Sequence, residues 1–441
     1  MRPLGLLLCV ALAAACSDGV GTEEQGTARH PVTLRVWAFG REGEVLEGVL
    51  APFARAHPEI RLRVQQIPFS AAHEKLLTAF VGDAPPDVAL LGNTWVPEFA
   101  ALGALAPLDR YLTPRSGIAP ADYFPGIWRT NIIADTLYGI PWYVDTRLLF
   151  YRSDLLADAG YADPPVTWDG WRAAMQRIRA RSGGSTYGVL LPINEWQPLI
   201  ALAVANGAPL LRDGGRYGDF EESRFRAAFA FYLGLFRDSL APPLSDVQVA
   251  NRYQSFSRGE FAFTITGPWD IGEYERRLPA ALAGRWRTAP MPAPDGVAFP
   301  GASLAGGGSL VVFRRSRATS AAWSLIEFLS EPARQGAFAA LTGDLPTRMS
   351  AWRDTSSGLD TNRYARPFRV QLEHLAAVPM VPEWEEIAAT VADHAASAAR
   401  GAVTADAALA ALDRDVDRLL EKRRWLLAHQ RGESDAGRVS Q

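Results

Sequence analysis

The chain has 441 residues, of which 48% are hydrophobic, 21% charged and 10% aromatic. This composition is typical of a globular protein and excludes collagen-like, coiled-coil and wholly disordered classes. A net charge of −3 provides no basic excess, so no nucleic-acid partner is expected.

The first segment has the pattern of an export signal. A basic Arg2, a short apolar run and small residues lead up to Cys16. The pattern predicts a secretory signal peptide over 1–15, which is too short to span a bilayer as a mature helix. Small residues directly before a cysteine resemble the cleavage box of bacterial lipoproteins, which implies lipidation of Cys16; ordinary cleavage near Ala15 is the alternative. Residues 16–31 are then expected to form a flexible tether.

From residue 32 onward, predicted strands and helices alternate. Apolar periodicity predicts strands at 32–39, 60–64 and 87–91 with helices between them, then strands at 148–151, 188–191 and 261–265, a helix at 168–178 and a helix at 406–427. Strands alternating with helices predict an α/β fold of two or three domains with mainly parallel sheets, at roughly 100–200 residues per domain. Ligands of such sheets bind at the carboxyl ends of the strands. No later run reaches about 18 apolar residues, so no membrane span is expected in the mature chain.

Five predicted loops at or just beyond strand ends combine aromatic rings or small residues with carboxylate, amide or guanidinium groups. They are 39–44, 92–95, 141–147, 194–197 and 266–270. A pyranose has apolar C–H faces that pack on rings, and hydroxyls that need planar hydrogen-bonding groups. We therefore predict a carbohydrate site if the fold brings these loops together. A single loop tryptophan is by itself more often part of a core.

Other site chemistries have weaker support in the sequence. Asp145 and Glu195 are formally available as a glycosidase pair, but no spacing distinguishes a general acid from a nucleophile. The histidines form no close ligand pair, so no metal site is expected. No nucleotide loop of Walker type, no nucleophile elbow and no dinucleotide fingerprint occurs, so no cofactor is expected. The triple glycine at 306–308 can instead let the backbone approach a ligand closely.

Three stretches resemble the extracellular solute-binding proteins of ABC sugar importers, the group that contains maltodextrin- and trehalose/maltose-binding proteins. They are LYGIPWYVDTRLLFYRSDLL (137–156), FSRGEFAFTITGPW (256–269) and AAWSLIEFLS (321–330). The resemblance covers roughly residues 32–430 and implies two α/β lobes joined by a hinge, with the sugar held between them. The expected lobes are 32–145 with 302–330, and 146–301 with 331–430; a polar tail is expected at 431–441.

The resemblance also implies roles for individual residues. Tyr143 and Asp145 fall where the family places a stacking ring and a hydroxyl-binding carboxylate. Trp269 matches the family's stacking tryptophan. Asn93 and Glu195 fall where relatives carry an Asp or Asn and a second acid.

Further positions are less specific. Glu42 or Glu44 occupies the first-loop position, and the choice between them is open; Gly307 and Gly308 match a glycine-rich strand beside the ligand. The sugar-binding arginine that many relatives carry is missing before Trp384, so their sugar preference does not transfer, although Trp384 stays a candidate. Neighbours in the five loops complete the expected ligand set: Thr94, Trp95, Trp142, Arg147, Trp196 and Asp270.

The resemblance thus implies an exported, lipid-anchored receptor and not an enzyme. It would capture a disaccharide or oligosaccharide as a monomer, close on it and deliver it to membrane permease subunits powered by a separate ATPase. Two alternatives stay open: a secreted carbohydrate-active hydrolase, and a receptor of the same fold for a non-sugar solute such as a glycerol phosphodiester. The second draws on Arg41 and Arg147, which suit a phosphate.

Overall fold

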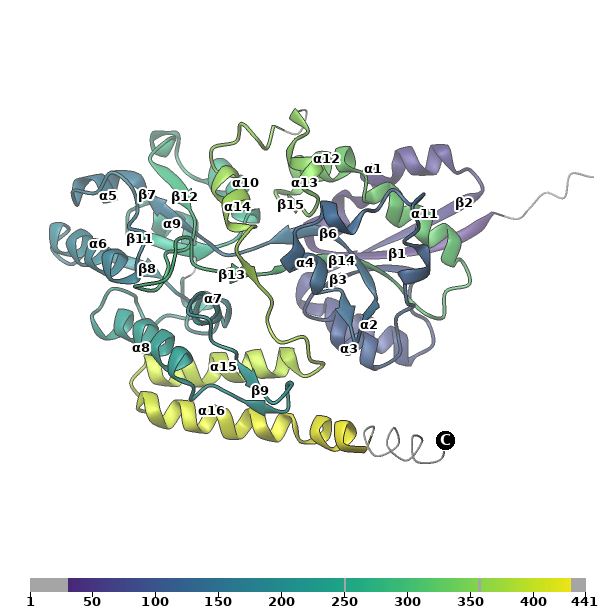
Figure 1. Ribbon diagram of the computed structural model, residues 1–441. Helices are drawn as coiled ribbons and strands as arrows, with labels where there is room; N and C mark the ends of the chain where they lie inside the picture. Colours follow the sequence, from purple (N-terminus) through teal and green to yellow (C-terminus); the bar gives the residue numbers. More distant parts are fainter. Residues whose placement is uncertain (1–30, 250, 356–357, 430–441) are drawn as a thin grey trace, which may run out of the picture.

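The computed structural model describes residues 31–249, 251–355 and 358–429. The predicted signal peptide, Cys16, the tether up to residue 30 and the polar tail lie outside these residues. Figure 1 shows two α/β lobes side by side, one built on a six-stranded sheet and the other on a four-stranded sheet. Within the described residues, no helix is both long and apolar enough to cross a membrane.

The first lobe contains the six-stranded sheet, in the order β15-β6-β14-β3-β1-β2. Its strands are β1 (Val32–Phe39), β2 (Ile60–Ile67), β3 (Val88–Gly92), β6 (Gly139–Asp145), β14 (Gly306–Val312) and β15 (Leu345–Pro346). Strand β1 pairs in parallel with β2 and β3, whereas β14 runs antiparallel to both β3 and β6. The strands predicted at 32–39, 60–64 and 87–91 are thus confirmed as β1, β2 and β3.

Helices cover both faces of this sheet. They are α1 (Gly40–Ala56), α2 (Phe69–Val81), α3 (Val96–Ala101), α4 (Pro125–Arg129), α11 (Thr319–Leu329), α12 (Pro332–Thr342) and α13 (Met349–Trp352). In α1, the residues Leu46, Leu50 and Phe53 recur every three or four positions and are buried on one face. A small hairpin of β4 (Ile132–Ile133) and β5 (Thr136–Leu137) leads into β6.

The second lobe contains the four-stranded sheet, in the order β12-β7-β11-β8. Its strands are β7 (Leu148–Arg152), β8 (Tyr187–Leu190), β11 (Phe261–Thr266) and β12 (Trp286–Ala289); β9 (Leu211–Arg212) and β10 (Tyr217–Gly218) form a separate pair. Its helices are α5 (Ser153–Asp158), α6 (Trp168–Arg181), α7 (Gln197–Ala205), α8 (Ser223–Arg237), α9 (Arg252–Ser257), α10 (Trp269–Arg277), α14 (Arg366–Gln371), α15 (Trp384–Ala399) and α16 (Ala405–Leu419). Helices α15 and α16 lie side by side beneath α8 (Figure 1).

The chain crosses between the lobes at more than one place. Residues 145–148 join β6 of the first sheet to β7 of the second, and β13 (Ser303–Leu304) returns toward β14 while it pairs with β16 (Leu375–Ala376). A buried cluster includes Val144 of β6 together with Phe150 and Trp286 of the second sheet. The crossings are thus packed together where the two lobes meet.

Two expectations about this architecture need correction. The sheets are mixed rather than mainly parallel, because β14 enters the first sheet between β3 and β6 only after the chain has built most of the second lobe. In the second sheet, only β11 and β8 are parallel. The first lobe also extends beyond residue 330, since β15 pairs with β6 and Phe338 of α12 belongs to the first lobe's core.

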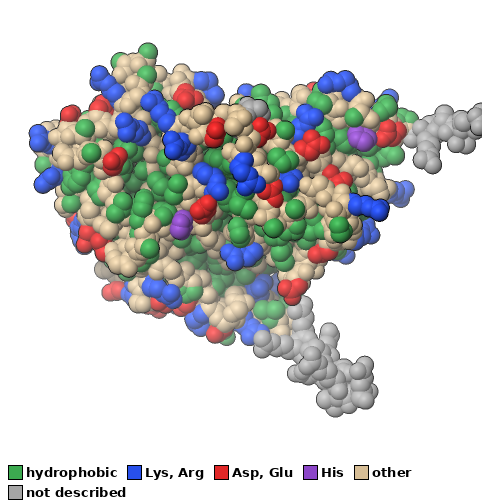
Figure 2. Space-filling model, turned by 45° about the horizontal axis from the view of Figure 1, so that its top comes forward, with side chains coloured by type: hydrophobic (Ala, Val, Ile, Leu, Met, Phe, Trp, Pro, Cys, Tyr) green, Lys and Arg blue, Asp and Glu red, His purple; other side chains and the backbone are tan. Residues whose placement is uncertain are grey.

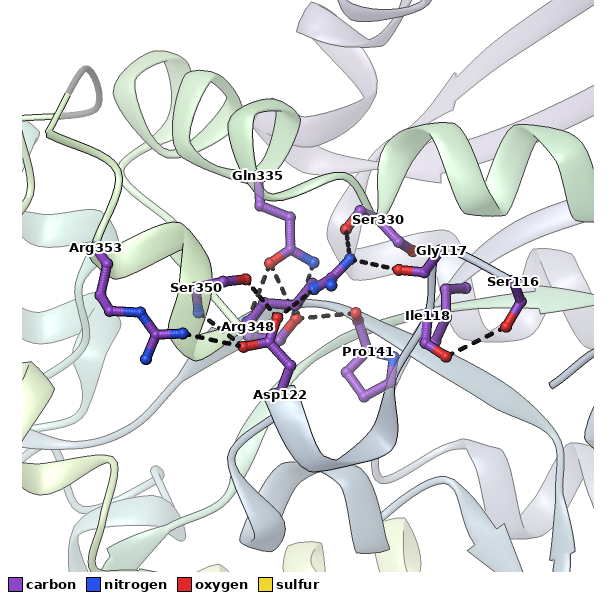
Figure 3. Close-up of polar contacts among 11 residues, drawn as sticks. Ser116, Gly117, Ile118, Asp122, Pro141, Ser330, Gln335, Arg348, Ser350 and Arg353 are labelled. Carbon is purple, nitrogen blue, oxygen red and sulfur yellow. Dashed lines mark hydrogen bonds and ion pairs between the residues drawn. The ribbon is translucent and has the colours of Figure 1, made fainter. Parts of the chain in front are cut away.

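A polar network fixes this late segment on the first lobe (Figure 3). Arg348 donates to Asp122 Oδ2 at 2.8 Å, to the Gly117 carbonyl at 2.9 Å and to the Ser330 carbonyl at 2.8 Å. Next to it, the Thr347 hydroxyl donates to the Pro141 carbonyl of β6 at 3.0 Å. These bonds connect segments far apart in the sequence, so they hold the chain around β15 against β6. We call this set the Arg348 network.

Candidate functional site

A cavity of about 830 Å³ lies between the two lobes. The first lobe contributes a wall of Gly40, Glu42, Phe69, Tyr143, Asp145 and Asp344. The opposite wall includes Glu195, Gln197, Asp246, Arg252, Tyr253 and Trp269, with Arg147 on the crossing segment. Basic and acidic side chains lie beside one another across the middle of the face in Figure 2, over the junction of the lobes. A concave site that combines rings with a few polar groups is the usual form of a small-molecule site.

Four of the five predicted loops meet at this cavity. Their contributions are Glu42, Tyr143, Asp145, Arg147, Glu195 and Trp269. Glu42 lies at the start of α1, Asp145 at the end of β6 and Trp269 at the start of α10. Parts of the chain that are more than 200 residues apart thus face one cavity. This convergence is the condition on which the sequence-based prediction of a carbohydrate site depended, and a ligand-binding role for each residue is still a prediction.

The first-lobe wall is a carboxyl cluster around one ring. Glu42 is hydrogen-bonded to the Tyr143 hydroxyl, and burial raises the pKa of Glu42. Burial also raises the pKa of Asp145, although the guanidinium of Arg147 works against that shift. The pKa of Asp344 is raised well above its ordinary value by burial and by the charge of Glu42. Neutral or poorly solvated carboxyls of this kind gain from hydroxyl partners.

Arg147 connects this wall to the opposite one. Its Nη1 donates to Asp145 Oδ1 at 3.2 Å, and its Cζ lies 4.6 Å from the centroid of the Trp269 ring. Glu195 lies close enough for the charge of Arg147 to oppose the rise in the pKa of Glu195 that burial causes. One guanidinium therefore interacts with three residues of the predicted ligand set.

Asp270 has a different place from the one expected. Its side chain is fully buried behind the cavity, where it accepts from Thr266 Oγ1 at 2.6 Å, from the Tyr253 hydroxyl at 2.8 Å and from Arg252 Nη2 at 3.2 Å. All three donors line the cavity. Asp270 thus positions side chains that can reach a ligand and does not reach one itself.

The glycines of β14 lie beneath the tyrosine and not beside the cavity. A Cβ on Gly308 would collide with the Tyr143 ring and come within 2.6 Å of Leu90 Cδ1, and a Cβ on Gly307 would collide with the Tyr143 carbonyl. Gly307 also has a φ of +134°, which favours glycine. These two glycines therefore make room for Tyr143 and do not line the cavity, and their expected place beside a ligand stays a prediction.

The loop at 92–95 does not line the cavity. Asn93 is buried, and its Nδ2 donates to the Ala305 carbonyl at 2.6 Å. Thr94 donates from Oγ1 to Glu385 Oε1 at 2.5 Å, which joins the two lobes. Trp95 is buried against Phe39, with ring centroids 5.4 Å apart. These three residues serve packing and contacts between lobes.

Other predicted residues also lie elsewhere. Trp142 is buried and stacks on Phe338, with ring centroids 4.1 Å apart. Trp384 is fully buried in the second lobe, where Trp196 packs edge-on against it at 5.5 Å. Glu44 is exposed and pairs with Arg41 at 3.0 Å. Of the two first-loop acids, Glu42 is therefore the one that lines the cavity.

Several lining residues were missed from the sequence. Asp246 and Asn251 precede α9, and Arg252 and Tyr253 are its first two residues, shortly before the stretch that begins at Phe256. Asp344 follows the end of α12. The cluster of Arg252 and Tyr253 beside the recognised stretch was a usable signal, whereas only the pairing of β15 with β6 places Asp344.

We expect the buried carboxyl of Asp344 in the first-lobe wall to make the free energy of unfolding depend on pH. Asp344 has an ordinary pKa in the unfolded chain and a higher pKa in the folded protein, so folding favours its protonated form. The contribution of this group to stability is therefore complete below the unfolded pKa and is lost as the pH rises through the folded pKa. Asp344→Asn should therefore raise the free energy of unfolding at neutral pH, because the amide carries no charge that burial and Glu42 would disfavour.

Thermal unfolding of both proteins across a pH series measures this effect. The extra stability of Asp344→Asn over the unaltered protein should disappear at about pH 3, where aspartate is protonated in both the folded and the unfolded protein. Glu47→Gln, which changes an exposed residue of α1, is the control and should have little effect at any pH. An advantage that is absent at neutral pH, or equal at every pH, would contradict the proposed electrostatic origin.

Among residues 31–249, 251–355 and 358–429, no group of three or more His, Cys, Asp or Glu side chains is arranged to hold a metal ion. The residues that line the cavity thus offer rings, carboxyls, amides and guanidiniums. Such a set can bind and orient a hydroxyl-rich molecule.

Comparisons with known proteins agree with this geometry. Residues 40–336, more than half of the chain, match the family of bacterial extracellular solute-binding proteins. The solved structure of the sugar-binding protein MalE from Xanthomonas citri is 45% identical, with a TM-score of 0.86 over 90% of this chain and 99% of that one. The diacetylchitobiose binding protein DasA of Streptomyces coelicolor is 24% identical over 387 residues, which cover 87% of this chain and 88% of that protein.

These matches confirm the resemblance drawn from the three sequence stretches and confirm the two-lobed fold. They extend over nearly the whole described chain, including the segments that form both walls of the cavity. The protein is a member of the bacterial extracellular solute-binding protein family.

Proposed function

We propose that this protein is the substrate-binding component of an ABC importer and that it takes a disaccharide or oligosaccharide into the cavity between its lobes. The observation that carries the proposal is the meeting of Tyr143, Asp145 and Trp269, from opposite lobes, around one cavity of about 830 Å³. Rings suit the C–H faces of a pyranose, and carboxyls suit its hydroxyls. The names of the relatives MalE and diacetylchitobiose binding protein support the same ligand class.

Binding between two lobes provides a way to signal occupancy. A sugar that contacts both walls favours the closed arrangement, by no more than its difference in affinity for the closed and open forms. A micromolar complex is worth about 8 kcal/mol, which is ample for a closure that costs a few kcal/mol. Permease subunits in the membrane then recognise the closed form. Lipid on Cys16 and the tether keep the exported receptor close to them.

A phosphodiester is a poorer ligand for this cavity. Five carboxyl side chains line it against three guanidiniums. Two of those guanidiniums already pair with carboxylates, Arg147 with Asp145 and Arg252 with Asp270, each at 3.2 Å. A phosphate would therefore face uncompensated negative charge.

The test is a titration of purified protein, by thermal shift and then by calorimetry, with maltose, trehalose, diacetylchitobiose, arabinobiose, amino acids and glycerophosphocholine. Stoichiometric binding of at least one sugar, without product on chromatography, is expected. Release of monosaccharides would instead identify a hydrolase, and binding of glycerophosphocholine alone would identify the phosphodiester receptor. Binding of none of the sugars would refute the proposal.

A further inference from the structure

The side chain of Arg147 lies between the two groups to which the proposed function assigns the sugar. Its guanidinium bonds to Asp145 at 3.2 Å and covers the Trp269 ring at 4.6 Å. Asp145 ends a strand of the first lobe, and Trp269 begins a helix of the second. The side chain of Arg147 is only 14% exposed, so it is enclosed within the cavity and does not extend into solvent.

A pyranose on the same two groups needs the same space. Its C–H face would take the place of the guanidinium on the ring, and one of its hydroxyls would take the place of Nη1 on the carboxylate. A planar guanidinium over an aromatic face is a favourable contact that must be given up before another group can stack there. We propose that Arg147 is an internal competitor for the sugar, which occupies the position between ring and carboxylate until a ligand displaces it. This inference rests on the proposed function.

The structure allows the side chain to leave while the backbone stays in place. The Ser303 hydroxyl donates to the Arg147 carbonyl at 2.8 Å, which ties the crossing segment to β13. Glu195 lines the same cavity and already feels the charge of Arg147. A displaced guanidinium can therefore turn toward another carboxylate, and its charge stays compensated in the poorly solvated cavity.

The competitor also sets a requirement on the ligand. To replace Arg147 at no loss, a molecule must supply both an apolar face for Trp269 and a donor for Asp145. A pyranose supplies both, whereas an acyclic polyol supplies donors without a flat face. Arg147 is thus a specificity-determining residue that favours ring sugars. Because it competes with every ligand for the same position, it also lowers the affinity for all of them.

The test compares Arg147→Ala with Arg110→Ala in calorimetric titrations of each titrated sugar that the unaltered protein binds. Arg110 is the matched control because it also covers an aromatic ring, that of Tyr111 at 4.8 Å, but does not line the cavity. Arg147→Ala should bind the sugar about 3 to 30 times more tightly, the range expected when a cation–π contact no longer competes. Arg110→Ala should stay within about twofold.

A double-mutant cycle with Trp269→Ala separates competition from a general structural effect. Without the ring only the competition for Asp145 remains, so the gain from Arg147→Ala should be clearly smaller in that background. Arg147→Lys, which keeps the charge without the planar fork, should gain less than Arg147→Ala and covers the case in which the alanine variant does not fold. Weaker binding by Arg147→Ala or Arg147→Lys would make Arg147 a direct sugar contact and overturn the inference. A gain that is undiminished without Trp269 would overturn it as well, whereas failure of the unaltered protein to bind any sugar would refute the proposed function itself.

Discussion

Trp269→Ala should weaken sugar binding at least tenfold and leave the melting temperature nearly unchanged. A tenfold loss corresponds to about 1.4 kcal/mol, which is within reach of one aromatic contact and its buried area. Trp269 is half-buried, lines the cavity and leans over Gly267, where a Cβ would collide with the indole ring. Because its ring faces the cavity and lies outside the three cores, its removal leaves no void in a packed interior.

Calorimetric titration and thermal unfolding measure the two halves of this prediction. Trp425→Ala is the matched control, since Trp425 is 58% exposed near the end of the described chain and does not line the cavity. The control should bind sugar as tightly as the unaltered protein does. Unchanged affinity in Trp269→Ala would remove Trp269 from the site.

Arg348→Met should have the largest effect on stability, a loss of about 3–5 kcal/mol in the free energy of unfolding. Burial by itself would raise the pKa of Asp122, but hydrogen bonds from Ser350 and Arg348 outweigh it and lower that pKa. Removal of the guanidinium takes from Asp122, whose side chain is 16% exposed, its nearest ion-pair partner. It also leaves the buried Ser330 carbonyl and the Gly117 carbonyl without this donor. A half-broken buried pair is costly for this reason.

Denaturant unfolding of Arg348→Met beside Arg353→Met isolates the buried contact. Arg353 also approaches Asp122, at 3.9 Å, but its side chain is 74% exposed (Figure 3). An exposed pair contributes about 0–1 kcal/mol, so the control should be nearly neutral. Equal losses in the two variants would show that the Arg348 network does not hold the segment around β15 in place.

Local patterns in the sequence predicted the elements well and their pairing less well. Strands β1, β3 and β11 coincide with runs of apolar residues. Helix α6 begins at Trp168, directly after Thr167, whose hydroxyl accepts from the Gly170 amide at 3.2 Å and caps the helix. The position of β14 between β3 and β6 is set by the return of the chain from the other lobe, which no local pattern contains. The expectation of mainly parallel pairing was wrong for the first sheet for that reason, and for the second because β7 pairs antiparallel with both β11 and β12.

The same limit applies to the site. Neighbours in a strand point to opposite faces, so of Trp142 and Tyr143 in β6 only one can face the cavity. The residue types do not say which, and the structure turns Trp142 inward onto Phe338 and Tyr143 to the cavity. Glu42 and Glu44 differ in the same way across α1. The sequence therefore identified four of the segments that line the cavity, and the direction of each side chain had to come from the tertiary packing.

The proposed function depends on one sugar being held by rings and carboxyls from both lobes. A crystal structure of the protein with the sugar that it binds most tightly decides this point. We expect a pyranose in the cavity of about 830 Å³, stacked on Trp269 and hydrogen-bonded to Asp145. A sugar held by one lobe only, or bound outside this cavity, would contradict it.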